Sequence, residues 1–136
     1  MSSLHVRVRI ADEDYALPVA DVLEVAEFGD VTPVPGTGPA VLGVRNLRGK
    51  VLPILDLSTV LGLPPAPKPE RVAIVERAGS TAGLAIDAVT GVERLPEASE
   101  EVDSPHLLGA ALADGTLVGV VDVGSLLDAV TGVPTG

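Results

Sequence analysis

The sequence predicts an all-β protein with short helices, and two observations support this prediction. Hydrophobic residues make up 46% of the 136 residues but aromatic ones only 1%, so the core must consist mainly of Val, Leu, Ile and Ala. Such side chains suit pleated sheets. The 15 glycines and 12 prolines interrupt the chain too often for long helices and fit short strands joined by turns. A chain of this length is expected to form one domain with a sizeable core.

An internal repeat indicates how the strands are organised. Segment 42–57 is echoed by 108–123 at a separation of 66 residues, and 17–25 is echoed by 84–92 at a separation of 67. Matched segments in the same order indicate a tandem duplication. We therefore expect a single domain, residues 1–136, with a first β-barrel half at 1–63, a Pro-rich extended connector at 64–69 and a second β-barrel half at 70–136. Each half, a small antiparallel sheet or barrel, has too little core alone, so the halves should pack together.

The first repeat begins with an alternating strand. Residues 4–10 place aliphatic side chains on one face and His5, Arg7 and Arg9 on the other, which predicts a half-buried strand. Residues 12–14 form a turn, and 15–25 read as a strand end, one helical turn and a further strand. Residues 31–39, rich in proline and glycine, predict an exposed loop.

Each repeat then continues into a hairpin and a short helix. Asp114-Gly115 lies between apolar runs and is a strong two-residue hairpin signal, and internal alignment places Arg48-Gly49 at the corresponding tip. Serine before glycine predicts short helices at 58–61 and 125–130.

Composition opposes several classes of partner. The formal net charge is -10, which disfavours binding to phosphate backbones or anionic lipids. Tyr15 and Phe28 are the only aromatic residues, so stacking on nucleic-acid bases is not available. Cysteine is absent, and no apolar window reaches the length of a membrane span. We expect a cytoplasmic protein that binds no nucleic acid and does not insert into a membrane.

The first hairpin carries a basic cluster on this acidic chain. Arg48 is held outward on the turn, beside Arg45 and Lys50, whereas the second repeat has Asp114 at the matched position. The plain alternative is that these side chains solvate a turn and pair with neighbouring carboxylates. A charge required by the fold should occur in both repeats, so the asymmetry favours a recognition role for Arg48.

No catalytic constellation emerges from the sequence. Asp56 and Asp122 occupy matched positions before the two helices, where an acid/base pair is conceivable but capping of the helix amides is the better interpretation. His5 and His106 lack the spacing of metal ligands, and the glycine-rich segments fail the phosphate-loop and nucleophile-elbow patterns. We expect no enzymatic activity, no cofactor and no metal.

The motifs nevertheless resemble a known family. Residues 15–19, 22–25, 43–49, 52–57 and 83–89 are similar to the CheW-type chemotaxis coupling proteins, with Asn-Leu-Arg-Gly followed by Pro-Ile-Leu-Asp-Leu the most specific part. The resemblance implies two packed five-stranded SH3-like β-barrels without enzymatic activity. It implies a free-standing adaptor that joins the helical tip of a chemoreceptor to the regulatory domain of a CheA-type histidine kinase. The first strand lacks the aromatic residue often found in this family.

The resemblance also assigns a receptor contact near the groove between the barrels. Its residues match Arg48, Val22, Glu24 and Gly43, and the neighbouring Arg45 and Asn46 are included in the same prediction. The kinase contact is not assigned to residues. Two alternatives remain open: a CheW-like module in another signalling pathway, and a small acidic hydrolase that uses Asp56 and Asp122.

Overall fold

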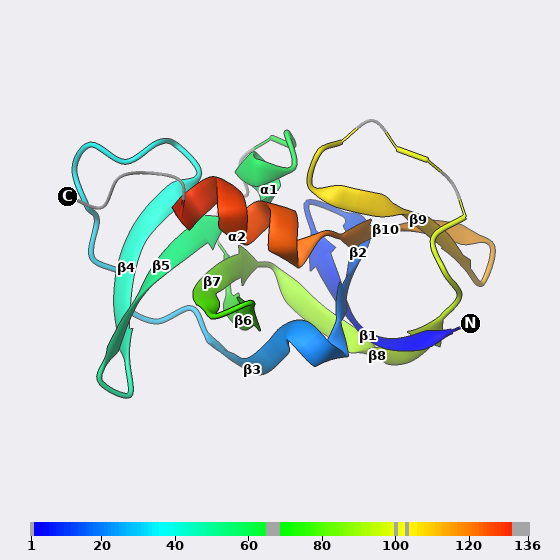
Figure 1. Ribbon diagram of the computed structural model, residues 1–136, viewed down its shortest axis with the longest axis horizontal. Coiled ribbons are helices and arrows are strands. Elements are labelled where there is room, and N and C mark those ends of the chain that lie inside the picture. The colour runs from blue at the N-terminus through cyan, green and yellow to red at the C-terminus, as the bar shows by residue number, and fades with distance from the viewer. Residues whose placement is uncertain (1, 65–68, 100, 103, 132–136) are drawn as a thin grey trace.

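The computed structural model describes residues 2–64, 69–99, 101–102 and 104–131, and its described part is built from two five-stranded β-barrel subdomains (Figure 1). The strands are β1 (Ser3–Ile10), β2 (Glu13–Pro18), β3 (Val22–Glu27), β4 (Val41–Leu47), β5 (Lys50–Asp56), β6 (Arg71–Arg77), β7 (Ser80–Ile86), β8 (Ala88–Leu95), β9 (Leu107–Ala113) and β10 (Thr116–Val121). A 3-10 turn, η1 (Val19–Asp21), precedes β3, and the helices are α1 (Leu57–Val60) and α2 (Val123–Thr131).

The strand order confirms the duplication but corrects the expected halves. One sheet has the order β8-β1-β2-β10-β9, and the other has the order β3-β6-β7-β5-β4. Each sheet therefore takes two strands from one repeat and three from the other, so residues 1–63 and 70–136 do not form one barrel each. Of the expected connector at 64–69, residues 65–68 are outside the described part.

The two sheets are equivalent down to their irregularities. The bulge between Val22 and Glu24 in the β3–β6 pair recurs between β8 and β1, and the bulge at Gly43 recurs in the β9–β10 pair. Each sheet also contains one parallel pair, β5 with β7 and β2 with β10, so the expectation of purely antiparallel halves is wrong. A parallel neighbour is possible because the two strands come from different repeats and need no tight turn.

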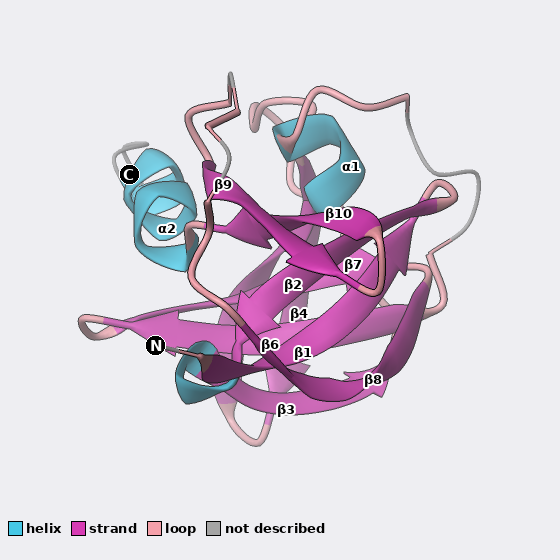
Figure 2. Ribbon diagram, turned by 90° about the vertical axis from the view of Figure 1, so that its right-hand side faces the viewer, coloured by secondary structure: helices cyan, strands magenta, loops and turns pink. Residues whose placement is uncertain are grey.

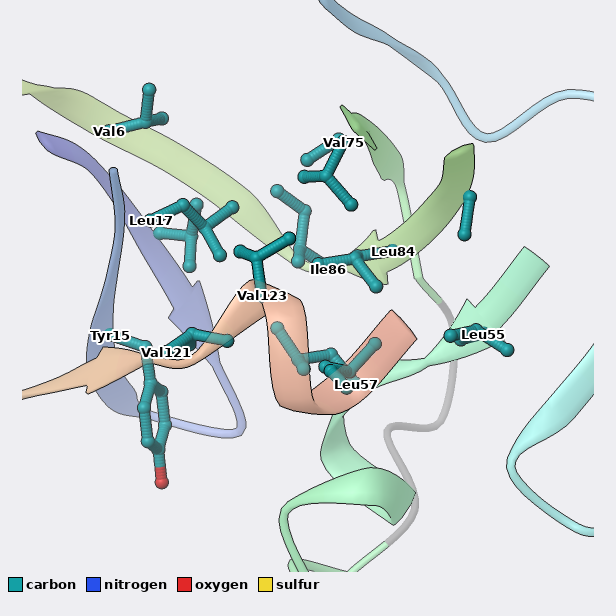
Figure 3. Close-up of a cluster of buried hydrophobic side chains, with 14 of the residues drawn as sticks. Val6, Tyr15, Leu17, Leu55, Leu57, Val75, Leu84, Ile86, Val121 and Val123 are labelled. Carbon is teal, nitrogen blue, oxygen red and sulfur yellow. The ribbon is translucent and has the colours of Figure 1, made fainter. Parts of the chain in front are cut away.

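The main core lies between the two barrels. Side chains from both sheets meet there, including Leu17, Leu55, Leu84 and Val121 (Figure 3). Helix α2 adds Leu126 and Leu127 to this cluster, and α1 adds Leu57. Figure 2 shows both helices lying on the same side of the strands. Among the described residues, neither helix has the length and hydropathy of a bilayer span.

The opposite face of each sheet is also covered, which corrects the prediction for the first strand. His5 is only 6% exposed, with its Nδ1 atom 2.9 Å from the Ser3 carbonyl oxygen, and the Arg7 side chain is 16% exposed. Alternation correctly placed Val6, Val8 and Ile10 on the face that meets the shared core, whereas Leu4 at the start of the strand is 45% exposed. It wrongly assigned His5 and Arg7 to solvent, because the curled sheet encloses that part of the face beside a second, smaller core containing Ala16, Leu95 and Val118. Arg9 does lie in solvent, with 51% of its side chain exposed.

Candidate protein-docking site

The β4–β5 hairpin presents Arg48 on a tight turn, as the sequence predicts. Leu47 pairs with Lys50, and both central residues have positive φ, 52° at Arg48 and 84° at Gly49. These values match the two-residue turn whose twist suits a hairpin. The Asn46 side chain accepts a hydrogen bond from the Gly49 amide at 3.0 Å, which fixes the turn from within. The Arg48 side chain is 78% exposed.

An ion pair connects this hairpin to the far edge of the same sheet. Arg48 Nη1 lies 2.7 Å from Glu24 Oε2, and Glu24 belongs to β3, whereas the hairpin begins with the other edge strand, β4. The interaction therefore spans the two edges and helps to close the barrel. Because Arg48 is mostly in solvent, its contribution to stability is small, about 0–1 kcal/mol.

Arg45 makes a second link between the same two edges. Its Nη1 donates to the carbonyl oxygens of Glu27 at 2.6 Å and Phe28 at 3.0 Å. The guanidinium also packs against Gly29, where a Cβ atom would lie 3.3 Å from it. The expected basic cluster of Arg45, Arg48 and Lys50 is thus incomplete, because the charged end of Arg45 is directed to the chain after β3. Lys50 remains exposed beside Arg48.

Gly43 and Val22 have positions that explain their residue types without a partner. A Cβ atom on Gly43 would lie 2.2 Å from the Thr32 carbonyl oxygen, because residue 32 pairs with Val44 across this point. Val22 packs against the shared core. Of the six predicted receptor-contact residues, the structure brings Arg48 and Glu24 together at the surface, while Asn46, Arg45, Gly43 and Val22 support the backbone around them.

Arg48 and Glu24 line a surface depression that we call the docking depression. Its volume is about 360 Å³. It is lined by Leu23, Glu24, Leu47, Arg48, Lys50, Leu52, Ile74, Glu76 and Thr81. The charged side chains of the lining form its rim, where the carboxylate of Glu76 accepts a hydrogen bond from Thr81 Oγ1 at 3.0 Å. The floor of the depression is largely aliphatic, with Leu52 and Ile74.

Sequence reasoning missed the apolar part of this depression. Leu23 is 57% exposed although it lies in a strand, because it is the bulged residue between Val22 and Glu24. Leu47 and Ile74 come from strands at other positions of the sheet. A leucine beside Glu24 in an alternating strand was a signal for Leu23, but nothing local indicated that Ile74 would lie nearby.

The carboxylates considered for catalysis are used in helix capping. Asp56 Oδ1 accepts hydrogen bonds from the amide of Ser58 at 3.2 Å and from its hydroxyl at 2.7 Å, and Asp56 Oδ2 accepts from Thr59. Asp122 Oδ1 accepts from the amide of Ser125 at 3.0 Å. Asp56 ends a strand of one sheet and Asp122 follows a strand of the other. The geometry therefore gives the hydrolase alternative no shared site.

The histidines are also separated. His106 Nδ1 lies 3.2 Å from Ser125 Oγ, and that hydroxyl donates to the Pro105 carbonyl oxygen. His5 belongs to β1 in the buried face described above. In the described part of the chain, no three His, Asp or Glu side chains are grouped as metal ligands.

Comparison with known proteins agrees with this architecture. The model of the CheW-like domain matches residues 5–131. A probable chemotaxis protein CheW from Rhizobium etli is 30% identical over 87% of this chain and 83% of its own length, and the protein FrzA from Myxococcus xanthus is 37% identical over 79% and 72%. The crystal structure of the scaffolding protein TtCheW from Thermoanaerobacter tengcongensis has a TM-score of 0.79 at 33% identity, covering 89% of this chain and 84% of that one.

A pair of packed barrels with an exposed depression, aliphatic at its floor and charged at its rim, is the architecture of a scaffold protein. The chain belongs to the CheW-like domain family, and its function is that of a chemotaxis coupling adaptor.

Proposed function

We propose that the docking depression binds the helical-hairpin tip of a chemoreceptor, while another surface of the same molecule binds the regulatory domain of a CheA-type histidine kinase. The single observation that supports the receptor contact best is the exposed Arg48 on a rigid turn beside an aliphatic floor. The adaptor would act in the cytoplasm, at arrays of membrane-anchored receptors.

A helix can use both parts of this surface. An aliphatic side chain of the helix would rest against Leu23 and Leu47, and an acidic side chain would reach Arg48 at the rim. Glu24 already holds Arg48, but the pair is exposed and weak, so a partner carboxylate can replace Glu24 at little cost. Apolar contact and the ion pair of the arginine then both contribute to affinity, and the arginine also fixes the orientation of the helix.

The test is the affinity of a soluble receptor-tip fragment for the Arg48→Asp variant, measured by isothermal titration calorimetry. Loss of an anchoring arginine should weaken binding about 30-fold, equivalent to about 2 kcal/mol. The melting temperature should hardly change, because Asp tolerates the positive φ of this turn. The matched control is Arg94→Asp on β8, an exposed site that gives the same change in net charge. Equal affinities of the two variants would refute the assignment.

A second assay separates the two partners. The kinase regulatory domain should bind the Arg48→Asp variant as well as it binds the wild type, because its contact lies elsewhere. Loss of both partners in that variant would show that Arg48 has another role.

A CheW-like module of another signalling pathway is the second candidate, since two of the similar proteins, FrzA and PilI, are not named as chemotaxis proteins. Co-purification from the native host, with neither a chemoreceptor nor a CheA-type kinase recovered, would favour it.

A further inference from the structure

The internal symmetry gives the docking depression a twin on the other barrel. Positions 67 residues apart are equivalent, since Ile74 faces Glu24 across the β3–β6 bulge and Arg7 faces Gly91 across the β1–β8 bulge. The twin depression is lined by Arg7, Asp14, Thr90, Gly91, Val92 and Glu93. Four of these, Arg7, Asp14, Thr90 and Gly91, are equivalent to Ile74, Thr81, Leu23 and Glu24 of the docking depression.

The two depressions have nearly the same size but opposite chemistry. Their volumes are about 330 and 360 Å³, so space does not distinguish them. Where the docking depression has the aliphatic Ile74, the twin has the guanidinium of Arg7. Where the docking depression has the exposed Leu23, the twin has Thr90. The same backbone therefore carries an aliphatic floor in one barrel and a charged floor in the other.

Three side chains make the charged floor, and we call them the ionic triad: Asp14, Arg7 and Glu93. Arg7 Nη1 lies 2.6 Å from Glu93 Oε1, and Arg7 Nη2 lies 2.9 Å from Asp14 Oδ2. Arg9 also pairs with Asp14, at 3.2 Å. The hydrogen bond that Arg7 donates to Glu93, ahead of the one it donates to Asp14, raises the pKa of Arg7, so the guanidinium stays charged. Its Nε atom is buried without a hydrogen-bond partner among the described residues.

We propose that the ionic triad is a specificity determinant, which keeps the apolar side chain of the receptor tip out of the twin depression and so confines docking to one barrel. This inference rests on the proposed function. An aliphatic group seated over Arg7 would remove the remaining water from a charged network and offer no acceptor to Nε, which is costly for ionised groups. Without this determinant, the aliphatic side chain of the receptor tip could enter either depression. Only the difference between Arg48 and Asp114 at the two hairpin tips would then favour one barrel, and the position of the kinase relative to the receptor would be less well defined.

The molecule itself supplies the substitutions that test this idea. Arg7→Ile/Glu93→Ala copies the residues at the equivalent positions, Ile74 and Ala26. It leaves the net charge unchanged, and Asp14 keeps Arg9 as its partner. Removal of both partners leaves no unpaired buried charge, and Glu93 is 35% exposed, so the cost of the double substitution in stability should be small.

Site-specific photo-crosslinking reads out which barrel is occupied. The chain has no cysteine, so Glu27→Cys, three residues after Glu24 on β3, and Arg94→Cys at the equivalent position of β8 can each carry a single cysteine-attached photo-crosslinker. With the receptor-tip fragment, we expect crosslinking from position 27 in the wild-type background and at most about a tenth of that yield from position 94. In Arg7→Ile/Glu93→Ala, the yield from position 94 should rise at least about threefold above its value in the wild-type background. It should stay below the yield from position 27, because the second repeat has Asp114 where the first has Arg48.

The outcomes separate the two claims. If position 27 gives no crosslink in the wild-type background, the proposed function fails. Comparable yields from both positions in that background would leave the proposed function intact and overturn the specificity role. The same role is overturned if position 94 stays silent in the double variant while circular dichroism and the crosslink from position 27 show a folded protein. If that variant does not fold, Arg7→Met/Glu93→Ala replaces it, and continued silence at position 94 again overturns the inference.

Discussion

The stability of a Gly43→Ala variant distinguishes a structural role of Gly43 from a direct contact with a partner. The residue is buried in β4, its φ is +151°, and a Cβ atom would lie 2.2 Å from the Thr32 carbonyl oxygen and 2.9 Å from Val31 Cγ1. The chain at Thr32 would have to move away. That movement would break the two hydrogen bonds between Thr32 and Val44, both 2.9 Å long.

The expected cost of Gly43→Ala follows from these contacts. A non-glycine residue at such a φ costs about 1–3 kcal/mol, and each lost hydrogen bond costs about 1 kcal/mol. The total is about 4 kcal/mol, a large part of the stability of an ordinary domain. For a chain of this length, 1 kcal/mol corresponds to roughly 3.5 °C, so the melting temperature should fall by about 14 °C.

Gly91→Ala is the matched control. Its φ is +156°, nearly that of Gly43, but nothing lies within 4 Å of the added Cβ atom. Gly91→Ala should therefore lose only the free energy that a non-glycine residue costs at this φ, about 2 kcal/mol. Urea unfolding followed by circular dichroism would measure both variants, and thermal unfolding would give the second reading. If Gly43→Ala is no less stable than Gly91→Ala, the close approach of Thr32 does not explain the glycine, and a direct partner contact becomes the better reason for it.

Two further predictions concern buried polar groups. Asp56→Ala should lower the free energy of unfolding by about 1–2 kcal/mol because it removes the acceptor at the start of α1, whereas Asp56→Asn, which keeps one acceptor, should lose less in the same urea titration. Burial and the 2.7 Å hydrogen bond to Glu13 raise the pKa of Tyr15 well above its usual value of 10.0. The raised pKa of Tyr15 should stabilise the folded state in full below pH 10. This contribution should fall as the pH rises above 10, because the unfolded chain then loses the tyrosine proton before the folded chain does. As Tyr15 is the only tyrosine and tryptophan is absent, near-ultraviolet absorbance should show no tyrosinate before unfolding; ionisation of the folded protein near pH 10 would contradict this.

The sequence was sufficient for features determined by neighbouring residues. The tips at Arg48-Gly49 and Asp114-Gly115 lie where the turn chemistry places them, and both pairs have positive φ. The one helical turn before β3 and the caps at Asp56 and Asp122 are likewise local. Each of these features requires only a short segment to meet its own hydrogen-bonding and steric demands.

Strand partners and the apolar half of the site were beyond such reasoning. Alternation shows that a strand has two faces, but it does not identify the strand beside it or show that a barrel encloses the second face. Arg7 was therefore expected in solvent and instead lies in a mostly buried ion pair. Arg48 and Glu24 were found through their charges and the resemblance, whereas Ile74 reaches the same depression only through long-range pairing of β3 with β6.

The exchange of strands between repeats explains why the two equivalent depressions could become different only by substitution of their lining residues. Residues 1–63 hold two strands of one sheet and three of the other, and residues 70–136 hold the remainder, so neither half contains a complete barrel. The repeats cannot separate into independent modules, and each depression combines side chains from both. Ile74 and Thr81 of the second repeat complete the depression that Leu23 and Arg48 begin in the first. A substitution in either repeat consequently changes both the barrel it stabilises and the surface that this barrel presents. Under the proposed specificity role, the difference between Ile74 and Arg7 acts together with that between Arg48 and Asp114 to make a symmetric backbone bind asymmetrically.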